Sequence, residues 1–420
     1  MINKIIIFFL LLVSPAYATT YYCGSGQAQT TIAQVNALDL VAGDIVLFNR
    51  GETWSGLLSC KDGVTYSNYG SGALPKINGT ADNSHIITIL DADDVIIDGL
   101  AVGDGGNTHH DMSGIAITGS HNVIVRNCNL NLGNNYLGID AYSYNAARYT
   151  HDILIENNII ANAYEIGIQN NSDQTNDHLY NITIRVNKVS GTTGNGINIG
   201  WHSKDTIVEG NYVTTSTGCG ICFDSGIVNG HVRNNICYNN VKNIGTEGDS
   251  SHGDALGVYI DNNTCIYGAT TQWSGFRLSL GGKPSTIRIR NNIVVGKSDT
   301  YYFIDDIRNN MKDYFSDYNY FYNETGNPPK FNLAGTVYNN LTSFQTTGND
   351  THSITDDPLL TVDYHLQSTS PCIGNGTNLG ITEDYWGNPR PRPAKFPSLL
   401  PDIGASEYIA PTDSWMHFSN

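Results

Sequence analysis

The 420-residue chain has little charge and few bases. Charged residues make up 15% of the sequence, and 22 Lys and Arg stand against 39 Asp and Glu, for a formal net charge of −17. Binding to a nucleic-acid backbone requires a basic stripe, so we expect no nucleic-acid partner. Beyond Ala18 no segment approaches the run of about 18 apolar residues that a membrane-spanning helix needs. We therefore expect no membrane span and, by composition, a monomer.

The first residues differ from the rest. Lys4 precedes the apolar run IIIFFLLLV, and the small-residue pattern Ala16-Tyr17-Ala18 follows it. This order of a basic residue, an apolar run and small residues is typical of a secretory signal peptide. We predict cleavage near Ala18 and export to the periplasm or the extracellular space.

A short motif of apolar residues and asparagines repeats along the middle of the chain. It occurs as ILIENNII (153–160), ITIRVNKV (182–189), TIVEGNYV (206–213), HVRNNICY (231–238), VYIDNNTC (258–265) and IRIRNNIV (287–294). Its last asparagines are Asn158, Asn187, Asn211, Asn235, Asn263 and Asn292, at intervals of 29, 24, 24, 28 and 29 residues. A period of this length indicates a solenoid, in which each unit buries its apolar face against copies of itself.

Each repeat also contains a second glycine-bounded segment. These segments begin at Gly138, Gly167, Gly196, Gly220 and Gly275 and read GIDAYS, GIQNNS, GINIGW, GICFDS and GFRLSL. Short β-branched segments without a 3.6-residue period predict an all-β chain, folded as a right-handed parallel β-helix. The recurring asparagines predict a side-chain amide ladder at a tight turn, with asparagine in the left-handed conformation.

The predicted solenoid divides the chain into four parts. Residues 1–18 form the signal peptide, 19–80 an N-terminal cap and first coil, 81–325 the β-helix, and 326–420 an irregular closing segment. A short amphipathic stretch at 31–38 is expected to cover the open end of the first coil. Among eight cysteines, Cys237 and Cys265 occupy the same position of adjacent repeats and are predicted to form a disulfide. Cys219 and Cys222 have no second cysteine pair at zinc-ligand spacing.

The repeat also predicts which residues share a face. The isoleucine of each Gly-Ile strand points inward, so the residue after it points outward. A first outward column then holds Asp140, Gln169, Asn198, Cys222, Gly245 and Arg277, and a second holds Tyr142, Asn171, Gly200, Asp224, Glu247, Ser279 and Asp306. Asp224, Glu247 and Arg277 fall on successive coils of one face, which makes them the predicted catalytic centre.

Two neighbouring carboxylates either share a proton or hold a cation between them. A shared proton suits a glycoside hydrolase that uses Asp224 and Glu247. A cation suits a Ca²⁺ site formed by Asp224, Glu247 and Asp249, and calcium acidifies the C5 proton of a uronate. As a further alternative, these acids are solvated and Arg277 only pairs with Glu247.

Other polar and aromatic residues are expected near this centre. His252 lies in the polar loop GTEGDSSHGDA (245–255) and is a candidate proton donor. Candidate sugar-binding residues are Trp201, His202, Lys204, Tyr142, Asn198 and Lys283, of which the segment from Trp201 to Asp205 is expected to project from the same side as the strand at Gly196.

Several strings resemble known proteins. VAGDIVLFNRGETW (41–54), DPLL (357–360), and DYWGNPRPRP with DIGASEY (384–408) resemble the entry and closing segments of secreted bacterial β-helix proteins of the pectate-lyase-like superfamily. SGFRLSLGG (274–282) is similar to the Gly-Phe-Lys-Leu-Gly-Gly strand that carries the catalytic base of family nine polysaccharide lyases. Arg277 stands in place of that lysine, two extra residues follow it, and the family's Asp-Asp-Gly calcium cluster has no counterpart.

The resemblance implies a polysaccharide lyase that cleaves a uronate-containing chain by β-elimination. In that hypothesis Arg277 abstracts or polarises the C5 proton, His252 assists, and Asp224, Glu247 and Asp249 hold Ca²⁺. A glycoside hydrolase that uses the paired carboxylates is the second hypothesis, and a non-catalytic carbohydrate-binding or adhesive β-helix is the third.

Overall fold

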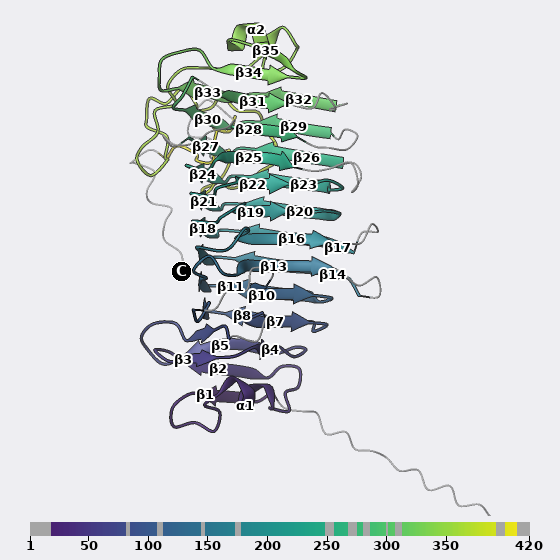
Figure 1. Ribbon diagram of the computed structural model, residues 1–420. Helices are drawn as coiled ribbons and strands as arrows, with labels where there is room; N and C mark the ends of the chain where they lie inside the picture. Colours follow the sequence, from purple (N-terminus) through teal and green to yellow (C-terminus); the bar gives the residue numbers. More distant parts are fainter. Residues whose placement is uncertain are drawn as a thin grey trace, which may run out of the picture.

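The computed structural model describes residues 18–80, 85–106, 112–143, 148–172, 178–247, 256–267, 275–279, 286–299, 301–306, 313–391 and 400–409. Within them, the chain winds into a stack of coils (Figure 1). Each coil contributes one strand to each of three long sheets, here named A, B and C, and all strand pairs are parallel except β34 with β35. The predicted right-handed parallel β-helix is confirmed. None of the helices in the described part of the chain is long and apolar enough to cross a membrane.

Sheet A has 12 strands and sheet B has 11 in the described residues. The strands of sheet A are β1 (Thr20–Cys23), β2 (Ile45–Asn49), β5 (Thr65–Tyr69), β8 (Ile96–Asp98), β11 (His121–Arg126), β14 (Thr150–Glu156), β17 (Leu179–Arg185), β20 (Ser203–Glu209), β23 (Val228–Arg233), β26 (Leu256–Asp261), β29 (Thr286–Arg290) and β32 (Asp313–Asp317). Those of sheet B are β3 (Thr53–Ser55), β6 (Lys76–Asn78), β9 (Ala101–Gly103), β12 (Asn129–Asn131), β15 (Ile159–Ala161), β18 (Lys188–Ser190), β21 (Tyr212–Thr214), β24 (Ile236–Tyr238), β27 (Thr264–Ile266), β30 (Ile293–Gly296) and β33 (Tyr320–Asn323).

Sheet C also has 12 strands in the described residues. They are β4 (Leu58–Ser59), β7 (Ile87–Leu90), β10 (Ser113–Thr118), β13 (Leu137–Ser143), β16 (Ile168–Ser172), β19 (Ile197–Ile199), β22 (Cys219–Phe223), β25 (Lys242–Glu247), β28 (Phe276–Ser279), β31 (Tyr302–Asp306), β34 (Lys330–Leu333) and β35 (Thr336–Tyr338). The chain passes from A to B to C in each coil, and the motif ILIENNII spans β14, the turn after it and β15.

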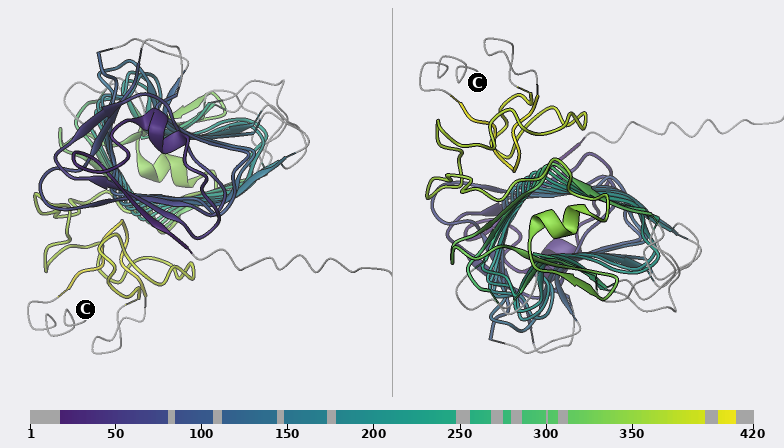
Figure 2. Two further views of the ribbon diagram at one scale, coloured as in Figure 1. Left: turned by 90° about the horizontal axis from the view of Figure 1, so that it is seen from below. Right: turned by 90° about the horizontal axis from the view of Figure 1, so that it is seen from above.

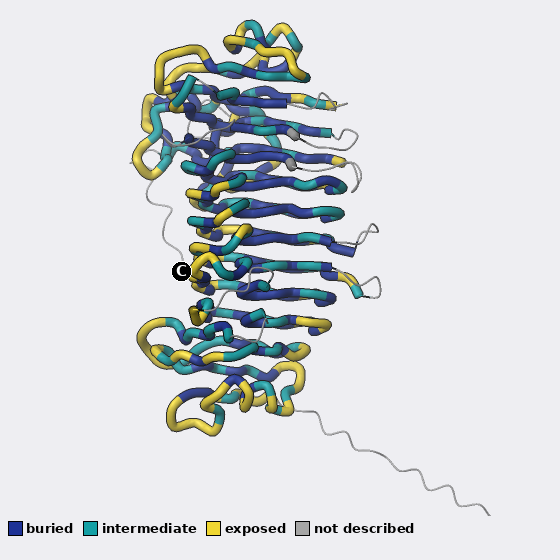
Figure 3. The backbone as a smooth tube through the Cα atoms, viewed as in Figure 1, coloured by how far each residue is buried: buried dark blue, intermediate teal, exposed yellow. Residues whose placement is uncertain are grey.

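The core lies inside the coils as columns of aliphatic side chains. One column in sheet A holds Val125, Ile155, Ile184, Val208, Val232, Ile260 and Ile289, all fully buried and in register. Buried bands follow the strands in Figure 3, and the exposed residues gather at turns and at the two ends. Because period-two alternation places every second side chain inside, the same few sequence positions build the core of every coil.

The predicted asparagine ladder is confirmed at the turn between sheets A and B. The Nδ2 atom of Asn158 donates to Oδ1 of Asn187 at 3.0 Å, and the same contact repeats from coil to coil as far as Asn319. The left-handed residue, however, is the one before each ladder asparagine, such as Asn157 with φ 53° or Val186 with φ 56°. The turn therefore divides its two requirements between two consecutive residues: the first takes the left-handed backbone and the second makes the buried amide contacts.

A short helix covers each end of the stack (Figure 2). Helix α1 (Ile32–Asn36) lies in the predicted amphipathic stretch, buries Ile32 and Val35, and begins with a capping box between Thr31 and Gln34. At the far end, α2 (Leu341–Gln345) buries Phe344. Its ring stacks on the ring of Phe331, with 4.5 Å between the two ring centroids. Each end of the apolar interior is thus closed by side chains from a helix.

The chain then turns back along the stack. We call residues 355–391 and 400–409 the return segment; it lies against the outer face of sheet B (Figures 1 and 2). There it encloses a second core, made of Ile266, Ile293, Val295, Tyr320, Leu366, Cys372 and Ile403. From β24 onward the strands of sheet B are largely buried on both faces, because one face meets the coil interior and the other meets the return segment.

The predicted disulfide between Cys237 and Cys265 is wrong. All eight cysteines lie in the described residues, all are buried and all have free thiols. Cys237 and Cys265 stand in register inside sheet B, between Val213 and Val294 of the neighbouring coils. They therefore occupy a core column in which a thiol packs as a small apolar group.

Candidate functional site

The outward face of sheet C carries a column of polar side chains, as predicted. The register pairs Asp140 with Gln169, Asn198, Cys222, Gly245, Arg277 and Asp305 in that order along the axis. Neighbouring strands lie about 4.8 Å apart, so the column is a polar strip that is interrupted at Cys222 and Gly245. Cys222 is fully buried within it.

Side-chain amides bind the carboxylates of this face. Gln169 donates to Oδ1 of Asp140 at 3.2 Å, Asn198 donates to Oδ2 of Asp224 at 2.9 Å, and Asn332 donates to Oδ1 of Asp305 at 2.8 Å. An amide satisfies a carboxylate oxygen without neutralising its charge. The face therefore concentrates negative charge from three different coils.

Burial perturbs two of these acids. It raises the pKa of Asp140 to about 6, although hydrogen bonds from Gln169 and Ser113 oppose the change. It also raises the pKa of Asp305, against the hydrogen bond from Asn332 and the attraction of Arg277. A carboxyl group with a raised pKa keeps a proton closer to neutral pH, which is a requirement for a general acid.

The three residues of the predicted centre lie on successive coils of this face. Phe223 pairs with Thr246 and Glu247 pairs with Ser279, so Asp224, which follows Phe223, comes level with Glu247. Arg277, on the next coil, lies two positions before Ser279 and is half-buried. The backbone register thus agrees with the predicted grouping of the three.

One member of the second predicted column is wrong. Asp306 pairs with Leu278 rather than following Ser279, and it is buried, where its Oδ2 accepts from the backbone N of Ala334 at 3.1 Å. Its neighbour Asp305 takes the outward position beside Arg277 instead. The register of β31 with β28 is regular: Ile304 takes the position of the inward isoleucine, so Asp306, two residues later, also points inward.

The candidate sugar-binding residues separate into two places. Tyr142 pairs with Asn171 on sheet C, and the Oδ1 atom of Asn171 accepts from the backbone N of Trp201 at 3.1 Å, so these residues adjoin one another. Trp201 and His202 form the turn from sheet C to sheet A. Lys204 lies in β20, level with Tyr180 on sheet A, and so does not share the face of Asn198 as predicted.

Other predicted residues lie outside the described residues. They are His252, Asp249 and Lys283, and of Glu247 the structure describes the backbone alone. Their proposed roles stay predictions. Within the described residues, no three His, Cys, Asp or Glu side chains gather as metal ligands would.

Sheet A carries a charged column that the sequence analysis missed. Its members alternate in sign from coil to coil in the order Asp98, Arg126, Glu156, Arg185, Glu209, Arg233, Asp261 and Arg290. Each arginine pairs with the acid of the preceding coil, at 2.6 to 2.9 Å. The signal was present in the sequence, since each member stands two residues before the ladder position of its repeat.

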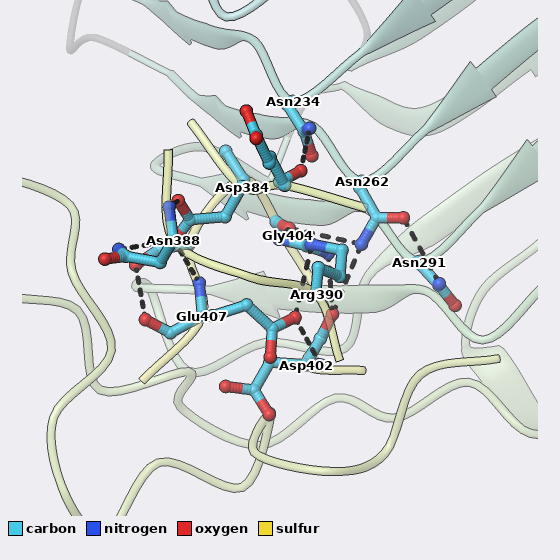
Figure 4. A network of polar contacts seen from close by, with 12 residues as sticks. Asn234, Asn262, Asn291, Asp384, Asn388, Arg390, Asp402, Gly404 and Glu407 are labelled. Carbon is cyan, nitrogen blue, oxygen red and sulfur yellow. Dashed lines mark hydrogen bonds and ion pairs between the residues drawn. The ribbon is translucent and has the colours of Figure 1, made fainter. Parts of the chain in front are cut away.

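The return segment is fastened by a buried polar network (Figure 4). Arg390 pairs with Glu407 at 3.2 Å, with both side chains 1% exposed, and its two terminal nitrogens donate to the carbonyls of Asp402 and Gly404. Asn234 and Asn262, two of the left-handed turn residues, donate to the carbonyls of Glu383 and Asp402. The carboxylates of this network are bound by backbone N–H groups and by Arg390, as expected of a structural anchor.

Fold and site together define a right-handed parallel β-helix with a polar strip along one outer face. More specifically, residues 49–268 match the family described as periplasmic copper-binding protein (NosD), and the chain belongs to that family. No curated protein sequence matches the chain.

Solved structures with a similar fold include enzymes that act on polysaccharides and oligosaccharides. A rhamnogalacturonan lyase is 13% identical, with a TM-score of 0.48 over 68% of this chain and 84% of that one. An alginate lyase from Paenibacillus sp. is 14% identical, with a TM-score of 0.44 over 73% and 93%. The GH136 lacto-N-biosidase from Eubacterium ramulus is 15% identical, with a TM-score of 0.45 over 72% and 68%. At this level the similarity concerns the fold alone.

Proposed function

We propose that the protein is an exported carbohydrate-active enzyme that binds an extended polysaccharide along the outward face of sheet C and cleaves it by β-elimination next to a uronate. The supporting observation is the polar strip itself. Within it the carboxylate of Asp140 is bound by the neutral amide of Gln169, whereas the acids of the charged column on sheet A each have an arginine partner. The family's description as periplasmic agrees with the signal peptide predicted at residues 1–18.

In the proposed reaction, Arg277 acts on the uronate. Arginine almost always keeps its proton, so its first task is to bind the substrate carboxylate and stabilise the negative charge that develops when the C5 proton leaves. His252 is the proposed acid–base residue: its neutral imidazole takes the C5 proton, the electron pair of the C5–H bond forms the C4–C5 double bond, and the C4–O bond breaks. The imidazolium of His252 then donates that proton to the departing oxygen.

Calcium is the proposed cofactor, with Asp224, Glu247 and Asp249 as its ligands. Bound there, the ion would neutralise the substrate carboxylate and acidify the C5 proton. Of the three side chains the structure describes Asp224, which already accepts from Asn198. The family description also names copper. The proposed ligands are carboxylates, which suit calcium rather than copper, so copper has no part in this proposal.

A glycoside hydrolase is the second candidate, because Asp224 stands level with Glu247 on the neighbouring coil. Hydrolysis of a glycosidic bond requires two carboxyl groups, one of which holds a proton. Two neighbouring carboxylates can share one proton, which is the arrangement that this reaction needs.

The test is to incubate the mature protein with pectate, alginate and glycosaminoglycans, and to follow both ultraviolet absorbance of unsaturated products and new reducing ends. We expect ultraviolet-absorbing products that disappear with a chelator and in Arg277→Gln, but persist in Arg126→Gln, the matched control on sheet A. Reducing ends without absorbance would replace the lyase by the hydrolase. Neither signal on any substrate would refute both and leave the adhesive β-helix.

A further inference from the structure

A cleft opens where the return segment leaves the corner between sheets A and B. The left-handed corner residues Asn234, Asn262 and Asn291 hold the segment through their side-chain amides. On the two preceding coils the same corner position is Gly210 and then Val186, which have no amide to offer. The segment overhangs the coils there, and the cleft beneath residues 380–387 has a volume of about 360 Å³.

The floor of this cleft is the middle part of the alternating column on sheet A. Glu156, Arg185, Glu209 and Arg233 line it. Arg185 uses Nε and Nη2 on one oxygen of Glu156, and Arg233 uses Nε on one oxygen of Glu209. Within the described residues, the second oxygen of each glutamate and the remaining guanidinium nitrogens make no hydrogen bond, so donors and acceptors alternate along the floor.

One wall supplies an acceptor that lacks a partner. Asn234 lines the cleft and is 5% exposed; its Nδ2 donates to the carbonyl of Glu383 at 2.7 Å, while its buried Oδ1 has no hydrogen-bond partner in the described residues. Leaving a buried acceptor unsatisfied costs about 1–3 kcal/mol.

Two further residues that line the cleft are Tyr385, which is half-buried, and Val186, whose apolar side chain is exposed. An aromatic ring next to alternating donors and acceptors suits a sugar, which has an apolar C–H face and hydroxyls that both donate and accept. The alternating signs disfavour a polyanion and a polycation equally, because either would meet two like charges.

We propose that this cleft is a second carbohydrate-binding site, specific for a short neutral oligosaccharide and separate from the strip on sheet C. Its volume lies in the usual range for small-ligand sites. The cleft would hold an uncharged part of a glycan while sheet C engages another part. The proposal stands independently of the reaction proposed above.

The test is calorimetric titration of the mature protein with cellotriose, xylotriose, mannotriose and chitotriose, and with trigalacturonate as the charged probe. We expect at least one neutral trisaccharide to bind with one-to-one stoichiometry. Arg185→Gln should weaken it by about tenfold or more, because a hydrogen bond to a charged group is lost. Arg126→Gln changes the same column outside the cleft and should leave the affinity unchanged.

A second pair of variants tests the wall. Tyr385→Ala should weaken binding, whereas Trp386→Ala, which removes the next ring along the chain, should not, because Trp386 lines a different cavity, of about 440 Å³. Arg277→Gln should retain full binding, which separates this site from sheet C. The proposal is overturned if no neutral trisaccharide binds, if Arg185→Gln and Arg126→Gln behave alike, or if Trp386→Ala or Arg277→Gln abolishes binding.

Discussion

Replacing Asn158 by alanine tests the asparagine ladder against its neighbour Asn157. Asn158 is 1% exposed; its Oδ1 accepts from the backbone N of Cys128, and its Nδ2 donates to Oδ1 of Asn187 and to the carbonyl of Val125. In the alanine variant the buried N–H of Cys128 loses its acceptor, which costs about 1–3 kcal/mol, and two further hydrogen bonds contribute about 1 kcal/mol each. We expect a loss of about 3–5 kcal/mol in the free energy of unfolding.

Asn157→Ala is the matched control in the same turn. Asn157 is exposed, and its Nδ2 donates to Oδ1 of Asn127. Alanine there loses one exposed contact and takes on a left-handed backbone, at a cost of about 1–2 kcal/mol. The difference between the two variants thus isolates the buried amide from the backbone conformation.

The assay is urea unfolding, followed by both far-ultraviolet circular dichroism and tryptophan fluorescence, because a solenoid can unfold in parts. Hydrogen exchange of the Cys128 amide gives a local reading, and this amide should exchange faster in Asn158→Ala than in Asn157→Ala. If both variants lose the same stability and the Cys128 amide exchanges equally in both, the ladder contributes no more than an exposed contact and the reasoning is refuted.

Three further outcomes follow from buried groups. Burial raises the pKa of Asp350 to about 6; the folded chain then holds its proton to higher pH than the unfolded chain does, so stability should fall from about pH 4 to about pH 6, and Asp350→Asn should reduce this slope in unfolding curves. Arg390→Met leaves Glu407 buried without its cation, which costs about 3–5 kcal/mol; limited proteolysis should cut the return segment while the coils resist, and equal resistance of both would contradict the assigned anchor. A thiol reagent should titrate all eight cysteines after denaturation without a reductant. If only six thiols react, the disulfide between Cys237 and Cys265 would be present after all.

The sequence predicted the coils well because each coil repeats the same physical solution. Alternating apolar residues and a buried asparagine recur at Asn158, Asn187 and each later ladder position, so one pattern located the interior, the turn and the outward column of sheet C. The column prediction failed at Asp306, where the chain leaves the Gly-Ile pattern. A sequence repeat predicts structure only over the residues in which the repeat occurs.

Features that do not follow the sequence repeat were missed. The return segment contains no repeat, and its packing against sheet B was not predicted, although the apolar residues of the strands at Ile236, Ile293 and Tyr320 indicated that both faces of sheet B are covered. The disulfide was predicted because equal repeat positions lie close together, but closeness inside a core column also suits two packed thiols. The cleft depends on Val186 and Gly210, whose importance appears only when the contacts of Asn234 are known.

The buried anchor of the return segment has a consequence for the order of folding. Coils can form as they emerge during synthesis, since each contacts only its neighbours. The return segment, however, is made after these coils. Its carbonyls at Glu383 and Asp402 accept from turn residues that were made much earlier, Asn234 and Asn262, and the pair of Arg390 and Glu407 holds the segment together. The cover over sheet B therefore forms after the coils, and a product truncated before Arg390 would have a finished spiral whose apolar flank stays open to other chains.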